Sequence, residues 1–382
     1  MKVLHVITSL GQGGAEAVLY RLVEASPGDI SHIVVSLRDE AYYGPRLRAL
    51  GVEVHALGMP RGRATLSGVF ELRRLIVRAA PDVVQTWMYH ADLLGGLVAR
   101  WVGARAVVWG IHHANLDADK TRLSTRIALM SCAFISSGIP TSIACCSHRA
   151  AAFHQAYGYR PDKFALIPNG LDLAKFSVDV FARRSVREDM GIDVETWLLG
   201  MVARWHPHKD HANLLEALAL LKAKVGNFRC LLVGTGMDTS NVALTGKIAK
   251  LGLEKQVILA GPRDDVPAVM NALDLHVLSS SSEAFPNAVA EAMACGTPCV
   301  VTDVGDAALI VGETGWVVPP RDALALSDAM ASALAALATQ GRDILGEMCR
   351  ARVAAEFGLD RMVGAYAKLW REAVEAGSER EG

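Results

Sequence analysis

Short apolar runs typical of buried strands alternate with amphipathic helical patterns along nearly the whole chain. Apolar strands separated by helices indicate a parallel sheet that is covered by helices on both faces. The helical spacing is clear at 15–24 and 66–79. The pattern therefore predicts a doubly wound α/β fold. A first set of strands is expected at 2–8, 31–37, 52–57, 82–86, 106–111 and 142–146.

The pattern is interrupted near residue 170. The sequence IPNGLD combines a proline with an Asn-Gly turn, and a charged stretch follows at 183–189. We therefore predict a first domain at 1–175 and a second domain at 176–357. Residues 358–382 are expected to form a helix that crosses back to the first domain, followed by a solvated tail. The second set of strands is expected at 197–203, 229–233, 256–260, 274–278 and 298–301.

The composition excludes several classes of protein. The chain has 382 residues, of which 51% are hydrophobic, and its net charge is −1. The charge asymmetry between its two halves is too weak to indicate a nucleic-acid partner. Seven cysteines without paired Cys-x-x-Cys spacing indicate reduced thiols. The apolar run before Gly11 is interpreted as a strand and not a signal peptide, and the run at 127–135 is shorter than the ~20 residues of a membrane span. These features predict a cytoplasmic protein.

Glu283 and Glu291 lie eight positions apart across a turn that opens a helix. Pro286 suits the first helical turn, because the N–H that it lacks would have no partner there. The amides of Asn287 and Ala288 would then point towards an anion. Two carboxylates around a phosphate-binding helix start suit a nucleotide-sugar pocket. The alternative is a buried amphipathic helix with one capping and one surface glutamate.

The sequence GQGGAE follows the first strand and resembles a dinucleotide-binding loop. Glu16, however, stands where that fingerprint has its third glycine, and its carboxylate would repel a pyrophosphate on the same helix start. Gly13 and Gly14 still allow a close backbone approach. We expect the loop to face a neutral or hydroxyl-rich group, or a phosphate held from across a cleft. An ordinary tight turn is the alternative.

Basic side chains follow two strands of the second set. Arg204 and Lys209 bracket a turn into a helix, and the pair could neutralise a diphosphate leaving group without a metal. His206 and His208 lack the carboxylate or cysteine that would complete a metal site. Arg263 lies at another strand end, where open α/β sheets bind ligands, although a surface turn would also explain this segment.

These motifs resemble those of the retaining GT-B glycosyltransferases of family four, and the resemblance covers nearly the whole chain. Its most specific part runs from Glu283 to Glu291 and continues through EAMACGTPCVVTDVGD; the segments GGAE, IPNGLD, VARWHPHKD and GWVVPPRD support it. The resemblance implies a GT-B fold, in which two Rossmann-like doubly wound domains face a cleft. Ala284 departs from the family pattern, because glycine is common at that position.

The resemblance also implies roles for individual residues. Glu283 would contact the donor sugar and Glu291 the nucleotide ribose, while Arg204 and Lys209 would hold the diphosphate. Further donor contacts would come from the helix start, from the turn that meets the base, and from two glycines of the first domain. These residues are Phe285, Pro286, Asn287, Ala288, Arg263, Val266, Gly13 and Gly14.

A catalytic histidine is implied at the end of a first-domain strand, and the strand at 106–111 ends in His112-His113. Either histidine could be the catalytic residue, and the sequence does not choose between them. His90 and Glu16 are candidates for contact with the acceptor. A core or capping role is the alternative for His90.

The implied reaction transfers a sugar from a nucleotide sugar, most often a UDP-sugar, with retention at the anomeric carbon and without a metal or another cofactor. The acceptor would be a glycan or its lipid carrier in bacterial surface polysaccharide synthesis. Three alternatives are a nucleotide-sugar epimerase of GT-B fold, a nicotinamide oxidoreductase and a non-catalytic scaffold. Glu16 argues against the oxidoreductase, and the charged site residues argue against the scaffold.

The segment 61–80 carries five arginines and a single acid. On a helix, Arg73, Arg74 and Arg78 would lie largely away from the apolar face. The segment therefore predicts a weak, salt-sensitive contact with an anionic surface, at the inner face of the cell membrane. The alternative is an ordinary surface helix whose apolar stripe packs on the sheet.

Overall fold

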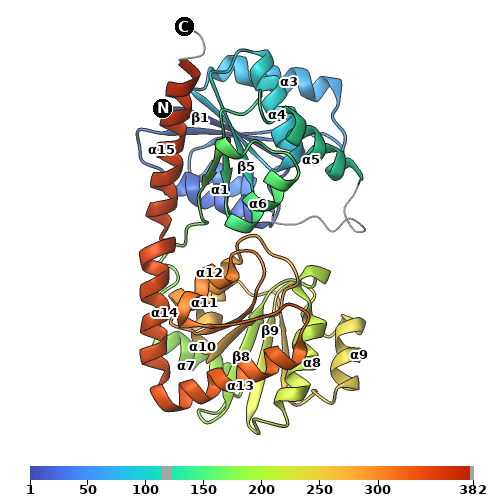
Figure 1. Cartoon of the computed structure of the whole chain (residues 1–382), viewed down its shortest axis with the longest axis vertical. Coiled ribbons are helices and arrows are strands. Elements are labelled where there is room, and N and C mark those ends of the chain that lie inside the picture. Colours follow the sequence, from blue (N-terminus) through green and yellow to red (C-terminus); the bar gives the residue numbers. More distant parts are fainter. Residues whose placement is uncertain (114–122, 379–382) are drawn as a thin grey trace. The chain divides into compact units, whose positions relative to one another are not determined.

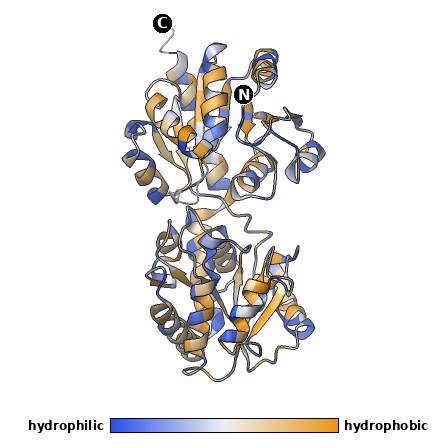
Figure 2. Ribbon diagram, turned by 90° about the vertical axis from the view of Figure 1, so that its right-hand side faces the viewer, coloured by the Kyte–Doolittle hydropathy of each residue, from blue (hydrophilic) through white to orange (hydrophobic). Residues whose placement is uncertain are grey.

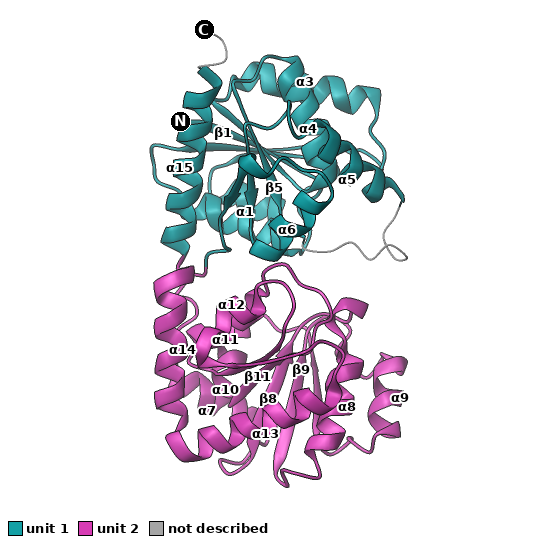
Figure 3. Cartoon of the chain, in the orientation of Figure 1, with its two compact units in different colours: residues 1–170, 359–382 teal, residues 171–358 magenta. Residues whose placement is uncertain are grey.

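The chain forms two compact units in a computed structural model that describes residues 1–113 and 123–378 (Figure 1). The first unit contains residues 1–170 and the segment that begins at Leu359, and the second contains Leu171–Gly358 (Figure 3). The second unit is therefore an insertion into the first. The predicted tail at 379–382 lies outside the described residues.

The described part of the first unit is built on a parallel sheet with strand order β3-β2-β1-β4-β5-β6-β7. Its strands are β1 (Lys2–Ile7), β2 (Ser31–Ser36), β3 (Glu53–Ala56), β4 (Val83–Trp87), β5 (Ala106–Ile111), β6 (Ser142–Cys145) and β7 (Phe164–Leu166). Its α-helices are α1 (Gly14–Glu24), α2 (Tyr43–Ala49), α3 (Leu66–Ala79), α4 (Tyr89–Trp101), α5 (Leu123–Ile135), α6 (His148–Ala156) and α15 (Leu359–Ser378), and one 3₁₀ turn is η1 (Pro161–Lys163).

The second unit has its own parallel sheet, with strand order β10-β9-β8-β11-β12-β13. Its strands are β8 (Trp197–Val202), β9 (Phe228–Val233), β10 (Val257–Gly261), β11 (Leu275–Leu278), β12 (Cys299–Thr302) and β13 (Trp316–Val318). Its helices are α7 (Val180–Asp189), η2 (Pro207–Lys209), α8 (His211–Leu221), α9 (Val242–Lys250), α10 (Val266–Ala272), α11 (Asn287–Ala294), α12 (Ala307–Val311), η3 (Gly312–Thr314), α13 (Ala323–Gln340) and α14 (Arg342–Phe357).

The order of the strands reverses once in each sheet, between β1 and β4 in the first unit and between β8 and β11 in the second. Open α/β sheets bind ligands outside the carboxyl ends of the strands at such a point. Because β8 and β11 are neighbours in register, with Leu275 opposite Leu199, the loops that follow them start side by side.

Burial explains why these segments form the elements that they do. The strands are largely apolar, whereas the helices carry both polar and apolar residues (Figure 2). In α3, for example, Leu72, Leu75 and Ile76 are buried on one face, and the Thr65 side chain accepts a hydrogen bond from the amide of Gly68 at the helix start. All seven cysteines are buried and free of disulfide bonds. The prediction of a doubly wound α/β fold is confirmed.

The helix α13 is the one helix among the described residues that is long and apolar enough to cross a membrane. Leu326, Met330 and Leu334 on this helix belong to the buried core of the second unit. The helix also packs against α8. Its apolar composition is therefore accounted for by the core that it covers.

The last helix, α15, packs in the core of the first unit. Met362, Tyr366 and Trp370 are buried with residues of β1 and β4. The indole N–H of Trp370 donates a hydrogen bond to the Gln85 side chain over 3.0 Å. The helix therefore packs against β1 and β4, which lie more than 250 residues earlier in the sequence.

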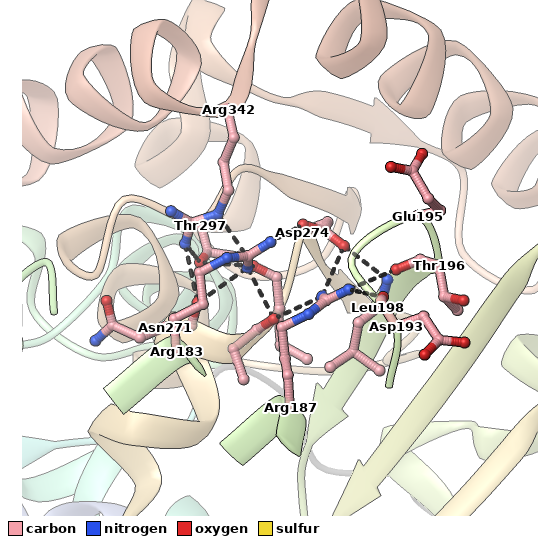
Figure 4. A network of polar contacts seen from close by, with 12 residues as sticks. Arg183, Arg187, Asp193, Glu195, Thr196, Leu198, Asn271, Asp274, Thr297 and Arg342 are labelled. Carbon is pink, nitrogen blue, oxygen red and sulfur yellow. Dashed lines mark hydrogen bonds and ion pairs between the residues drawn. The ribbon is translucent and has the colours of Figure 1, made fainter. Parts of the chain in front are cut away.

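The charged stretch at 183–189, which we expected beside the domain boundary, is helical and partly buried (Figure 4). Both Arg183 and Arg187 are ion-paired with Asp274, over 2.5 and 3.1 Å. Arg342 donates to the carbonyl groups of Asn271 and Leu273, and burial lowers its pKa to about 10. These arginines hold the amino end of β11, at the edge of the sheet opposite the predicted site.

Candidate active site

Glu283 lies in the loop between β11 and α11, and its carboxylate is held from two sides. The Lys209 ammonium lies 2.5 Å from its Oε1 atom, and the Ser280 hydroxyl donates to the same oxygen over 2.7 Å. The side chains of Glu283 and Lys209 keep 13% and 25% of their surface exposed. Since both are partly covered, screening by solvent is weaker than at the surface, and the ion pair fixes the orientation of the carboxylate.

The loops that carry this pair are tied together by their backbones. The Ser281 amide donates to the His208 carbonyl over 2.8 Å, and the Ser279 hydroxyl donates to the Lys209 carbonyl over 3.0 Å. Asp210 then takes a left-handed conformation, with φ of 47°, and caps α8. The reversal point of the sheet therefore brings together two residues that are 74 positions apart in the sequence.

The end of β12 and the loop that follows it contact the loop that carries Glu283. The Thr302 hydroxyl donates to the Ser280 carbonyl over 2.6 Å. Gly305 has φ of +53°, and a Cβ atom there would lie 2.3 Å from the Ala284 carbonyl oxygen, so only glycine allows this contact. The sequence analysis missed Ser280, Thr302 and Gly305. The run of four serines directly after the strand at 274–278 was the available signal.

The helix start beside Glu283 differs slightly from the prediction. Pro286 is the N-cap of α11 and precedes its first turn, with Phe285 buried against Phe357. Asn287 and Ala288 are the first two helical residues, and both are partly exposed. The N-cap residue makes no side-chain hydrogen bond to this end of the helix, and a helix start is a favourable position for an anion. Glu291 lies one turn further along the helix and is also partly exposed.

Arg204 follows β8 and is exposed. The loop that carries Arg204 is held against the loop after β9. The Trp205 amide donates a hydrogen bond to the Thr235 carbonyl, and Gly234, with φ of +141°, lies against Ala203. Burial lowers the pKa of the nearby His206, and the positive charge of Arg204 lowers it further. His206 is therefore kept neutral near a cluster of cations.

The structure places Arg263 and Val266 at the end of β10, but it pairs the arginine locally. The guanidinium donates to the Asp265 carboxylate, with 2.8 Å between Nε and Oδ1. Val266 is the first residue of α10 and is partly exposed. The charge of Arg263 is therefore partly neutralised by Asp265.

In the first unit, the predicted loop residues lie at the start of α1. Gly13 is the N-cap and Gly14 the first helical residue, and both keep exposed surface. The Glu16 side chain folds back over this helix start, so that a Cβ atom on Gly13 would lie 2.2 Å from Glu16 Oε2. A glutamate at this third helical position reaches back towards the N-cap, as in a capping box. This arrangement supports the local helix start.

The two adjacent histidines occupy different environments. The imidazole of His112 stacks on Trp87, with 5.1 Å between ring centroids, and burial lowers its pKa to about 3. His113 is exposed and stacks on Tyr89 at 6.4 Å. His90 lies in the first turn of α4, and burial lowers its pKa as well. A neutral His112 can offer a hydrogen bond but carries no charge at neutral pH.

The sequence analysis missed Asp92, which lies beneath the end of β5 and is completely buried. Its Oδ1 atom accepts hydrogen bonds from the Thr86 hydroxyl over 2.6 Å and from the Gly110 amide over 3.4 Å. Burial raises the pKa of this carboxyl group to about 7. Asp92 therefore supports the strand end that carries His112, and an acid beginning the helix after a buried strand was the available signal.

Replacing Asp92 with asparagine is expected to stabilise the protein at pH 8. The folded pKa is higher than that of an unfolded aspartate, so the folded state binds more protons and stability is lost as pH rises from about 4 to about 7. The asparagine side chain keeps an oxygen that can accept these hydrogen bonds, and it carries no charge. Differential scanning calorimetry should show a higher Tm by roughly 4 °C at pH 8. Asp82→Asn, at an exposed position, is the matched control; a gain as large at pH 4.5 as at pH 8 would contradict the expectation.

Two family models match the chain. The model described as Glycosyltransferase Family 4 matches residues 12–175, and the model described as Glycosyl transferases group 1 matches residues 197–336. The chain is 24% identical over 387 residues to an Escherichia coli UDP-Gal:alpha-D-GlcNAc-diphosphoundecaprenol alpha-1,3-galactosyltransferase, a match that covers 98% of this chain and 97% of that protein.

Solved structures with the same fold cover nearly the whole chain. Anabaena Alr3699/HepE in complex with UDP has a TM-score of 0.84 and 21% identity, over 96% of this chain and 99% of that one. Sucrose-phosphate synthase from Thermosynechococcus elongatus has a TM-score of 0.78 and 20% identity, over 98% and 100% of the two chains. At these identities the likeness shows the fold. Together with the two family models, it supports the conclusion that the chain is a glycosyltransferase of the GT-B fold.

Proposed function

We propose that the protein transfers a sugar from a UDP-sugar to a glycan or lipid-linked acceptor, with retention at the anomeric carbon. The ion pair between Lys209 and Glu283, beside the start of α11, carries the proposal. A cation and a carboxylate therefore lie beside a helix start, at the reversal point of one sheet. A diphosphate needs the cation and the amides, and a sugar hydroxyl needs the carboxylate.

The proposed donor and acceptor rest on similar proteins. A structural neighbour from Anabaena was solved with UDP and with UDP-glucose. The Escherichia coli relative is named for a UDP-galactose donor and a diphosphoundecaprenol-linked acceptor. These names support a UDP-sugar donor and a lipid-linked acceptor in the synthesis of a bacterial surface polysaccharide.

In the proposed mechanism, the bond between the anomeric carbon and the diphosphate breaks as the acceptor oxygen attacks from the same face. The departing diphosphate takes the proton of the acceptor hydroxyl. Arg204, Lys209 and the α11 amides stabilise the negative charge that develops on the diphosphate, and Glu283 positions the sugar. Two cationic side chains and a helix start supply this stabilisation without a metal. His112 is proposed to contribute a neutral imidazole.

The remaining site residues keep the roles proposed from the resemblance. Glu291 would bind the ribose, the turn at Arg263 and Val266 would meet the base, and Glu16 and His90 would contact the acceptor. For Arg263 this role requires that the base approach a guanidinium already paired with Asp265.

A thermal-shift series is expected to identify the nucleotide. UDP at 100 times its dissociation constant should add about 2.7 kcal/mol of stability, whereas GDP, ADP and NAD should add less.

Transfer activity should be unchanged when EDTA is added. Stabilisation by NAD alone would favour an oxidoreductase, and conversion of the donor without any acceptor would favour an epimerase. Activity that EDTA abolishes and Mg²⁺ or Mn²⁺ restores would exclude the metal-free mechanism.

A further inference from the structure

The helix α5 of the first unit exposes a stripe of large apolar side chains. Leu123, Ile127, Met130 and Phe134 are 70%, 53%, 64% and 87% exposed. Their spacing of four, three and four places them on one side of the helix. The opposite side is buried in the unit, through Ala128, Leu129, Cys132 and Ala133. The core therefore does not account for the exposed stripe.

Two further helices of the unit also expose large apolar side chains. Phe70 on α3 and Trp101 on α4 are 59% and 57% exposed, and their rings meet edge to face at 6.2 Å. The loop before α3 lies against the start of α5, since a Cβ atom on Gly62 would lie 3.0 Å from the Ser124 hydroxyl. The helix α4 packs against both α3 and α5. We call this surface the three-helix face; its apolar members are Leu66, Phe70, Trp101, Leu123, Ile127, Met130 and Phe134.

Exposed arginines border the three-helix face. The Arg73 guanidinium lies over the Trp101 ring, 5.1 Å from its centroid. Further exposed arginines lie in the loop before α3, on α3 and on α5: Arg61, Arg63, Arg74 and Arg126. Glu71 is the one acid in the described parts of α3, α5 and the loop at 59–65, and it is ion-paired with Arg74. The border of the face is therefore strongly cationic.

We infer that the three-helix face docks the first unit on a bilayer that contains anionic phospholipid. Large apolar side chains would enter the acyl boundary, while arginine and tryptophan suit the headgroup region, where long cationic side chains keep their charge in water. A second copy of the chain fits less well, because a symmetric contact would bring the same arginines together. Cationic charge around an apolar surface is complementary to anionic lipid.

This surface differs from the one that the sequence analysis predicted. The apolar stripe of α3, through Leu72, Leu75 and Ile76, is buried in the unit. Contact with a membrane would therefore use the outer side of α3, and the largest exposed apolar side chains lie on α5. The inference does not depend on the proposed function, because it concerns residues outside the donor site.

Co-sedimentation with vesicles tests the inference in the full chain. The protein should pellet with phosphatidylglycerol–phosphatidylcholine vesicles at low salt, and much less with phosphatidylcholine alone. The triple variant Ile127→Ser, Met130→Ser, Phe134→Ser should lose most of this binding. The matched control is Phe181→Ser with Val194→Ser, two residues of the second unit that are 82% and 89% exposed.

Charge reversal separates the electrostatic part of binding. Arg73→Glu with Arg126→Glu should weaken vesicle binding by at least about 25-fold, or about fivefold for each lost cation. Arg184→Glu, on an exposed arginine of the second unit, should change it little. Far-UV circular dichroism spectra and thermal unfolding midpoints close to those of the wild type should show that all variants fold.

Two results would overturn the inference. One is the absence of binding to anionic vesicles at low salt, or equal binding by the wild type and both sets of variants. The other is a stable dimer, seen by analytical ultracentrifugation, that the α5 variant dissociates, because a second copy would then be the occupant of the three-helix face.

Discussion

Replacing Glu283 with alanine is expected to reduce turnover by about 10²–10³-fold while leaving the fold intact, because one preorganised polar group at the reacting sugar is removed. The carboxylate lies in a loop and is 13% exposed, so its loss removes no core packing. Steady-state transfer kinetics at saturating donor measure the effect, and circular dichroism checks the fold.

The second unit offers a matched control for this variant. Glu216 forms a surface ion pair with Lys247 over 2.6 Å, between α8 and α9, and belongs to no predicted site. Glu216→Ala should leave turnover within a factor of two or so, as surface ion pairs contribute about 0–1 kcal/mol. A folded Glu283→Ala variant with near-normal turnover would remove Glu283 from the active site.

Replacing Lys209 with methionine is expected to weaken UDP binding by about 100-fold, for two reasons. The variant loses a charged contact to the diphosphate, which contributes about 1.5–3 kcal/mol. It also leaves the Glu283 carboxylate, now without its cation at 2.5 Å, near a ligand of the same charge. Isothermal titration calorimetry with UDP measures the affinity.

A double variant distinguishes these two contributions. In Lys209→Met with Glu283→Gln, the repulsion is gone but the lysine contact is not restored, so UDP affinity should recover by about tenfold from that of Lys209→Met. Coupling energies of about 0.5–3 kcal/mol are usual between contacting residues. Turnover should stay low. The matched pair Lys247→Met with Glu216→Gln should show no such recovery of UDP affinity. If Glu283→Gln restores no UDP affinity to Lys209→Met, the Lys209–Glu283 pair does not act on the ligand.

Much of the fold follows from patterns that are local in the sequence. The helical spacing at 66–79 matches α3 residue for residue, because its apolar stripe and the Thr65 cap act over short distances. The charged stretch at 183–189 was harder to interpret. Its arginines are partly buried because they form ion pairs with Asp274, a residue more than 80 positions away. No local sequence pattern predicts a partner at that distance.

The candidate site was predictable as a set of residues but not as a geometry. A glutamate before a helix start and a lysine in a turn are visible in the sequence. Their contact depends on β8 and β11 being neighbours in the sheet, and that neighbourhood is set by packing of the whole unit. The same holds for Gly305, whose role appears only when the loop after β12 lies against Ala284.

The insertion of the second unit into the first has a consequence for synthesis on the ribosome. The second unit is one continuous segment, Leu171–Gly358, so it can fold as soon as that segment has emerged. The first unit cannot close its core at that time, since α15 with Trp370 is translated last. We therefore expect the nascent first unit to expose, until translation ends, the apolar surface that α15 later covers. During that interval the unit should need protection from aggregation.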